Sequence, residues 1–262
     1  MDPEKAVEDV LEHGGVDLYG ESAELYDIMF SSNTSVQNKE QSVRRNVPEG
    51  SRVLDLACGT GIATERIGQD YDVTGVDLSR EMLEVASRKV LEADLAQADM
   101  RSLPYEEEFD AVVMYGHPLS HLESFHDVDQ TLRSVYGTLK EDGVLVTDFL
   151  TERIGDVESM GSTEKELGKY TVRMRPEFSD YNPATHEADC TIRFEIEDGE
   201  ELQEFGYDSR VKGFSPEQLR HMLEEAGFDT VEEQTIFHSQ IQQGIRAEKG
   251  DPGHGVELGF SM

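Results

Sequence analysis

The sequence predicts an α/β protein with a doubly wound, mainly parallel β-sheet and an antiparallel β-sheet inserted after the fifth strand. Three observations support this fold class. A glycine-rich turn joins an early apolar strand to a helix, and further apolar runs then alternate with segments of helical periodicity. About sixty residues late in the chain break this alternation and read as consecutive strands.

The glycine-rich turn, Ala57-Cys58-Gly59-Thr60-Gly61, follows the apolar run 53–56. A second apolar run, 73–76, ends in Asp77, whose carboxylate can accept hydrogen bonds from both hydroxyls of a ribose. A dinucleotide fingerprint would require glycine where the chain has Thr64, and the chain contains no Walker phosphate loop. The turn and Asp77 therefore predict a nucleoside pocket without a phosphate site.

A helix and two strands are expected next. Ser79 is placed to cap a helix whose apolar residues recur at three- and four-residue spacing. These residues are Met82, Leu83, Ala86 and Val90. The runs 93–98 and 109–115 follow as the third and fourth strands, and the second of them is apolar nearly throughout, as a strand covered on both faces should be.

Another helix separates the fourth strand from the fifth. We expect Asp127 to cap this helix, because a carboxylate there can accept from the first backbone amides. Its apolar positions are Leu132, Val135 and Leu139. Gly143 then opens the fifth strand, 144–149, which completes five strands joined by crossover helices.

The C-terminal part returns to the same pattern. Ser215-Pro216-Glu217-Gln218 is a capping box with proline at the first helical position, and Gly227 ends that helix. The segments 228–237 and 240–247 read as an antiparallel hairpin at one edge of the sheet. The residues from Glu248 onward are rich in glycine and charge and are expected to be mobile.

Between the fifth strand and that helix lie the segments 169–177, 185–198 and 201–212, in which apolar and polar residues alternate. They predict three antiparallel strands. An insertion at this place would lie above the carboxyl edge of the parallel sheet, where such sheets bind ligands. We expect the insertion to be a substrate cap or an oligomer surface, which would be the contact surface of a homodimer. The alternative is a decorative insertion without either role.

These expectations divide the chain into five parts. At 262 residues the chain is long enough to bury one full core that carries an insertion. The parts are a helical N-terminal lid (1–46), a nucleoside-binding core (47–150), the β insertion (151–212), the C-terminal part of the core (213–247) and the tail (248–262).

The acidic composition limits the partners. Aspartate and glutamate number 56 against 23 lysines and arginines, a formal net charge of -33 spread along the chain. Such a surface repels phosphate backbones and anionic membranes, so nucleic acid is an unlikely partner and no membrane partner is expected. The composition is typical of salt-in halophiles, with an acidic protein of an ordinary organism as the alternative.

Other segments indicate a cytoplasmic protein. The N-terminus lacks the basic and apolar regions of a signal peptide, and no apolar run reaches the length of a membrane span. Two cysteines, Cys58 and Cys190, provide neither a disulfide framework nor the spacing of metal ligands. No metal site is expected.

The chain resembles the class I S-adenosylmethionine-dependent methyltransferases over roughly residues 20 to 247, in particular the small-molecule N-methyltransferases. The aminosugar N,N-dimethyltransferases are the closest group, followed by glycine N-methyltransferase-like enzymes. The matching strings are Tyr26-Asp27, Asp55-x-Ala57-Cys58-Gly59-Thr60-Gly61, Asp77-Leu78-Ser79, Asp99-Met100-Arg101 and 109–113. This resemblance implies a seven-stranded Rossmann-like sheet and S-adenosyl-L-methionine as the cofactor of the core 47–150.

The resemblance also assigns residues to that cofactor. It implies that Asp77 takes the ribose hydroxyls, that Asp99 accepts from the exocyclic amine of adenine, and that Asp55 helps to hold the methionyl ammonium group. The turn residues Ala57, Gly59, Thr60 and Gly61 would frame the methionyl portion. The adenine would lie among Leu78, Met82 and Met100, and backbone atoms of Tyr115 and Gly116 would touch the methionyl group.

The loop after the fourth strand differs from the aminosugar enzymes and supplies the catalytic candidates. It reads Gly116-His117-Pro118-Leu119-Ser120-His121-Leu122. An amine must be neutral to attack a sulfonium methyl group, so a base that titrates near pH 7 would help, and histidine is such a side chain. His117 and His121 are the candidate bases, and the ring face of Tyr26 is expected to stabilise a cationic transition state, with Tyr19 beside it.

We therefore expect a methyltransferase of a small-molecule acceptor, preferably an amine. One alternative is a tRNA or protein methyltransferase, which would need a basic channel built from Arg173, Arg175, Arg193 and Arg210. Another is a non-catalytic S-adenosylmethionine-binding protein, which would have no acceptor cavity beside the cofactor.

Overall fold

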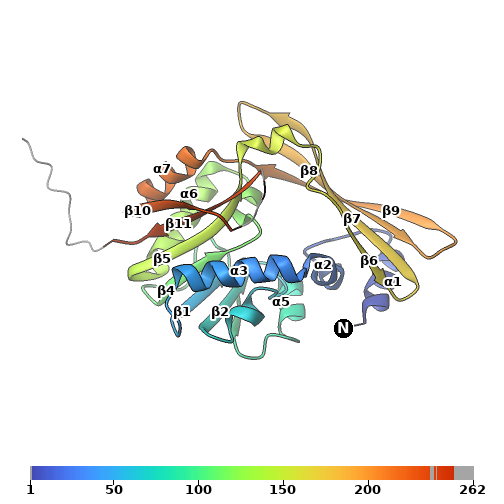
Figure 1. Cartoon of the computed structure of the whole chain (residues 1–262), viewed down its shortest axis with the longest axis horizontal. Helices are drawn as coiled ribbons and strands as arrows, with labels where there is room; N and C mark the ends of the chain where they lie inside the picture. Colours follow the sequence, from blue (N-terminus) through green and yellow to red (C-terminus); the bar gives the residue numbers. More distant parts are fainter. Residues whose placement is uncertain (1, 237–238, 240, 251–262) are drawn as a thin grey trace, which may run out of the picture.

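The computed structural model describes residues 2–236, 239 and 241–250. Figure 1 shows a central sheet with helices on both faces and a second sheet that projects beyond one end of it. The helices are α1 Pro3–His13, α2 Ala23–Phe30, α3 Asn33–Asn46, α4 Thr64–Ile67, α5 Arg80–Ala86, α6 Phe125–Thr138 and α7 Pro216–Ala226, with short 3-10 helices η1 Pro118–His121 and η2 Glu152–Asp156. Within the described part of the chain, no helix is long and apolar enough to cross a membrane.

The strands form two separate sheets. The first contains β1 Arg52–Leu56, β2 Asp72–Asp77, β3 Asp94–Gln97, β4 Phe109–Met114, β5 Leu139–Leu150, β10 Thr230–Gln234 and β11 Gln242–Glu248. The second contains β6 Thr163–Leu167, β7 Tyr170–Asn182, β8 Glu187–Glu197 and β9 Leu202–Lys212.

The larger sheet has the predicted architecture. Its order is β10-β11-β5-β4-β1-β2-β3, and the five strands from β5 to β3 pair in parallel. β11 runs antiparallel to both β5 and β10, which confirms the C-terminal hairpin. The strand order reverses between β1 and β4, and ligands of open α/β sheets bind outside the carboxyl ends of the strands at such a switch point.

Apolar side chains cover both faces of this sheet. Leu132 of α6 and Leu219 of α7 pack with Phe149 on one face. On the other face, Val43 of α3 and Ile67 of α4 join the cluster that includes residues of β1, β4 and β5. Burial on both faces explains why β4 is apolar nearly throughout.

Three element limits differ from expectation. α5 ends at Ala86, short of Val90, and the chain continues in separate turns. Ser124, not Asp127, caps α6: its hydroxyl accepts from the amide of Asp127, whose carboxylate accepts from the amide of Ser124. Asp127 is thus the third helical residue of a capping box. β5 begins at Leu139, because a bulge lets this residue pair with β4 before the expected strand starts.

The inserted sheet has four strands, so the prediction of three was wrong. β6 pairs with β7, but its sequence Thr-Glu-Lys-Glu-Leu has few apolar residues to reveal it. The buried face of the sheet shares a core with the N-terminal helices, in which Val172 and Phe194 join Val7 of α1 and Leu25 of α2. The insertion and the N-terminal segment therefore form one packed unit (Figure 1).

The expected mobile tail begins too early. Glu248 is the last residue of β11, and the side chain of Lys249 is buried and donates to the carbonyl oxygens of Tyr136 and Leu139. These bonds anchor Lys249 against the region between α6 and β5. The rest of the expected tail, residues 251–262, lies outside the described residues.

Candidate active site

A cavity of about 630 Å³ lies at the carboxyl ends of β1, β2 and β4. Its walls come from three parts of the chain: the parallel core, the N-terminal segment around α2, and β8 and β9 of the inserted sheet. A smaller pocket of about 180 Å³ shares Ala57, Asp77, Met100 and His121 with it and adds Leu78 and Asp99. The sheet edge expected from the topology thus carries a continuous site.

The glycine-rich turn and Asp77 are held together by direct bonds. One carboxylate oxygen of Asp77 accepts from the amide of Gly59 at 2.7 Å, and the other accepts from the amide of Ser79 at 2.9 Å. Gly59 has a φ of +56°, and a Cβ placed there would meet no protein atom. Burial raises the pKa of Asp77, although the bonds from Ser79 and Gly59 oppose that shift. The turn therefore presents bare backbone and an oriented carboxylate to the cavity.

Three of the expected cofactor residues do not line either pocket. Asp55 is buried and accepts from the hydroxyl of Thr64 at 2.6 Å. The hydroxyl of Thr60 points away and donates to Asp27 at 2.6 Å. Gly61 faces the end of α5 and the turn after it, where an added Cβ would lie 3.2 Å from Ala86 and 2.6 Å from Val90. These three residues therefore support the glycine-rich turn on the side that faces away from the pockets.

The remaining expected cofactor residues surround the two pockets. Met82, Met100, Tyr115 and Gly116 line the larger one. Leu78, with 64% of its surface exposed, and Asp99 line the smaller one. The Asp99 carboxylate is also held by the guanidinium of Arg101, whose hydrogen bonds hold the pKa of Asp99 below its usual range.

The two histidines of the loop after β4 occupy different places. His121 lines both pockets, whereas the ring of His117 lies behind the loop, and its buried Nδ1 has no hydrogen-bond partner in the described part of the chain. Their rings stack at 5.6 Å. Burial lowers the pKa of His117 to about 4, and burial followed by the neighbouring His117 lowers that of His121 to about 3.

These pKa values make both rings weaker bases than free histidine, and a base role for His117 or His121 stays a prediction. That prediction relied on the ordinary pKa of histidine, yet both rings are neutral at pH 7 and resist protonation. His121 can still exchange hydrogen bonds with a ligand through its ring nitrogens.

The N-terminal segment is fastened over the site at two points. Asp27 of α2 accepts from Thr60 in the glycine-rich turn and forms an ion pair with Lys89. The hydroxyl of Ser79 donates to the carbonyl oxygen of Tyr19 at 2.6 Å. The segment that carries Tyr19 and Tyr26 is thereby attached to both loops that contact Asp77.

Three tyrosines from two distant parts of the chain meet in the cavity. The ring of Tyr19 lies 5.8 Å from that of Tyr26 and 5.5 Å from that of Tyr207 on β9, and the ring of His121 is 6.1 Å away. Tyr207 was not predicted, because one tyrosine in an alternating strand looks like any other half-buried position. Only the fold brings β9 to this place.

The opposite end of the cavity is charged. Lys212, with 4% of its side chain exposed, donates to Glu187 at 2.6 Å, and Arg210 lies 3.6 Å from the same carboxylate. Glu123 and Asp208 add two more carboxylates to the lining. With Asp77, four carboxylates and two cations line the cavity, so its lining is net negative.

Comparison with known proteins identifies the class. A methyltransferase-domain family profile matches residues 53–143. The Bacillus subtilis protein YqeM, which has a provisional methyltransferase name, is 31% identical over 219 residues, covering 80% of this chain and 86% of its own. A glycine/sarcosine N-methyltransferase of Aphanothece halophytica is 32% identical over 202 residues, covering 73% and 71%. The structure of the sugar N-methyltransferase KedS8 from Streptoalloteichus has the same fold, with a TM-score of 0.73 at 20% identity over 87% of this chain and 92% of that one.

The chain therefore belongs to the class I methyltransferases that use S-adenosylmethionine. The residues present fit this cofactor, because the turn at Gly59 leaves space that a Cβ would enter and the Asp77 carboxylate is turned toward the cavity. When bound, S-adenosylmethionine supplies an electrophilic methyl group on a sulfonium. The protein is therefore a methyltransferase.

Proposed function

We propose that this methyltransferase transfers the methyl group to the nitrogen of a small-molecule amine. The observation that carries the proposal is the second half of the cavity, where neutral aromatic side chains meet a wall of three carboxylates and two cations. A negative cavity attracts an ammonium ion, and the tyrosine faces stabilise positive charge on nitrogen. Relatives named for glycine, sarcosine and sugar amines agree with this class of acceptor.

In the proposed reaction the amine lone pair forms the new N–C bond while the C–S bond breaks, and its electron pair stays on sulfur. The protein then has little covalent chemistry to perform, and alignment contributes most of the rate. Asp77, with Gly59 and Ser79, would fix the ribose, and Leu78, Asp99 and Met100 would enclose the adenine. The amine would have to lose its proton before transfer, because only a neutral amine has a free lone pair.

The charged side chains of the inserted sheet do not favour a nucleic acid. Arg173 lies against Glu164, Glu195 and Glu197, and Arg175 and Arg193 both pair with Glu177. Arg210 faces Glu187 and Asp189. Each arginine of the alternative basic channel thus has a carboxylate beside it, which weakens the case for phosphate binding. The non-catalytic alternative is disfavoured because the cavity extends beyond the cofactor residues to β9 of the inserted sheet.

The test is a methyl-transfer assay with isotopically labelled S-adenosylmethionine and a panel of acceptors. Primary and secondary amines, including glycine, sarcosine and aminosugars, should accept the label, whereas matched alcohols and carboxylates should not. Mass spectrometry would locate the added methyl group on nitrogen. Transfer to oxygen or carbon acceptors alone would refute the amine proposal while leaving the enzyme class intact.

A further inference from the structure

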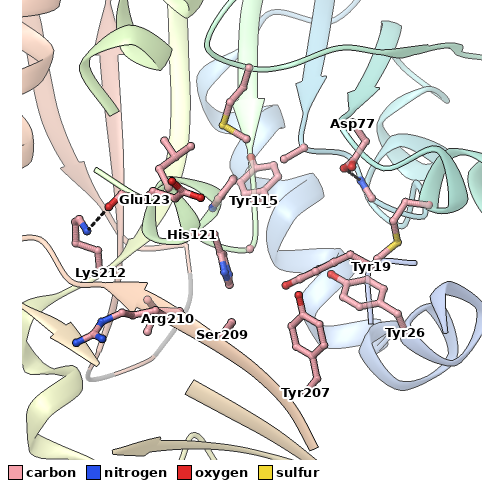
Figure 2. Close-up of a pocket in the computed structure, with 18 of the residues that line it drawn as sticks. Tyr19, Tyr26, Asp77, Tyr115, His121, Glu123, Tyr207, Ser209, Arg210 and Lys212 are labelled. Atoms are coloured by element: carbon pink, nitrogen blue, oxygen red, sulfur yellow. Dashed lines mark hydrogen bonds between the residues drawn. The ribbon is translucent and has the colours of Figure 1, made fainter. Parts of the chain in front are cut away.

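The inserted sheet contributes directly to the cavity through Tyr207. This residue lies on β9, while Tyr19 and Tyr26 belong to the N-terminal segment. Figure 2 shows the hydroxyl ends of the three tyrosines turned toward one another beside His121, in agreement with ring distances of 5.8 and 5.5 Å. Three polar groups from two distant parts of the chain therefore point to one small region.

These hydroxyls have no protein partner. Among the residues that the structure describes, none forms a hydrogen bond with the hydroxyl of Tyr19, Tyr26 or Tyr207, although the hydroxyls of Tyr71 and Tyr115 bond to backbone carbonyls. Polar groups inside a protein are generally paired. None of the three hydroxyl oxygens is among the buried unpaired atoms of the described residues, so each one opens to the cavity, where water or a ligand can pair with it.

The protonation state of the three tyrosine hydroxyls indicates what they bind. Burial is the main cause that raises the pKa of each of the three phenols, so all three are neutral and each offers lone pairs as well as one O–H. His121 is neutral too. A cage that binds through ring faces alone suits a fully methylated ammonium, but converging oxygens suit a nitrogen that still carries hydrogen.

We infer that Tyr207 is a specificity-determining residue, whose hydroxyl acts with those of Tyr19 and Tyr26 to bind the N–H groups of the acceptor amine. The site then favours primary and secondary amines and discriminates against nitrogen without hydrogen, because such a nitrogen leaves the phenol oxygens unpaired. This inference rests on the proposed amine acceptor. It gives the inserted sheet a role in choosing the substrate.

The test measures binding of three probe cations, methylammonium, dimethylammonium and tetramethylammonium, to the full-length protein saturated with S-adenosylhomocysteine. We expect the wild type to prefer methylammonium over tetramethylammonium by about tenfold or more, as two or three hydrogen bonds would give. In Tyr207→Phe, which keeps the ring, this preference should fall about fivefold. Tyr181→Phe removes a hydroxyl of the same sheet that bonds to His186 outside the cavity, and it should leave the preference unchanged.

The affinity for S-adenosylhomocysteine and the melting temperature of Tyr207→Phe show whether its fold and cofactor site are intact. Binding of all three cations without an N–H preference, or a preference that Tyr207→Phe retains in full, would overturn the assignment of Tyr207 while leaving the amine proposal standing. Failure of every cation to bind the wild type would instead overturn the amine proposal and this inference with it.

Discussion

Asp148 gives a sharp test of the electrostatics of the site, because its carboxylate is buried behind the loop after β4. One oxygen accepts from the amides of Gly116 and His117 at 2.8 and 3.1 Å, while the other is buried and has no partner in the described part of the chain. Burial raises the pKa of Asp148 from 3.8 to about 6, although the bond from His117 and the charge of Lys39 oppose this shift. The ionised carboxylate thus costs stability.

The sign and size of the effect follow from linkage. A carboxyl whose pKa is raised by folding binds more protons in the native state, so its contribution is most favourable below pH 3.8 and is lost as the pH rises through 6. The difference between the folded-state pKa of about 6 and the ordinary pKa of 3.8 corresponds to about 3 kcal/mol of unfolding free energy. About half of it, roughly 1.5 kcal/mol, falls between pH 5 and 8. This range avoids the isoelectric region near 4.4.

Asp148→Asn removes this titration while its amide oxygen can still accept from both backbone amides. We expect the free energy of unfolding of the variant, minus that of the wild type, to increase by roughly 1.5 kcal/mol from pH 5 to pH 8. Urea unfolding at fixed ionic strength measures this difference, in which the titrating groups that do not interact with Asp148 cancel. Asp127→Asn is the control: the Ser124 hydroxyl and then Arg101 hold the pKa of Asp127 below its usual range, so this carboxylate is ionised in both states and the difference for this variant should stay nearly constant from pH 5 to pH 8. A difference for Asp148→Asn that does not change with pH would refute the reasoning.

Four further outcomes are expected. Asp77→Ala should weaken S-adenosylhomocysteine binding about 10- to 100-fold in calorimetry, as for a lost charge-assisted bond, and Asp77→Asn, which still accepts from one amide, should lose less. Thr60→Val should speed dissociation of S-adenosylhomocysteine about five- to tenfold in stopped-flow measurements, because it removes the bond to Asp27 that fastens the N-terminal segment; an unchanged rate would contradict that role. Because the pKa of His121 is lowered to about 3, kcat/KM of the wild type and of His121→Gln should have parallel pH profiles from pH 5.5 to 8, and a wild-type ionisation near 6.5 that the variant lacks would support the base mechanism. The melting temperature should rise markedly from low to molar salt because counterions screen a net charge of -33, and a melting temperature indifferent to salt would remove the halophile hypothesis.

The parallel core was predictable because its information is local. Strand β1, the turn at Gly59 and the strand end at Asp77 lie within one short stretch, and the capping residues Ser79 and Ser215 mark helix starts by their own chemistry. The strand β6 could not be found in this way. Its polar sequence forms a strand because β7 supplies its hydrogen bonds, and that partner is a property of the tertiary structure.

The acceptor half of the site was harder to predict for a related reason. Sequence reasoning selected His117 and His121 by their residue type, but the pKa of a histidine depends on surroundings that the sequence does not give. Conversely, Tyr207 is far from Tyr19 in the chain, and no local pattern distinguishes it from other half-buried strand residues. One side of the cavity is the glycine-rich turn, which adjacent residues in the sequence reveal. The other side is a wall that forms only when the inserted sheet packs on the N-terminal helices. If β9 binds the acceptor as we propose, single residues of that strand can change acceptor recognition without altering the glycine-rich turn, which lies far from β9 in the sequence.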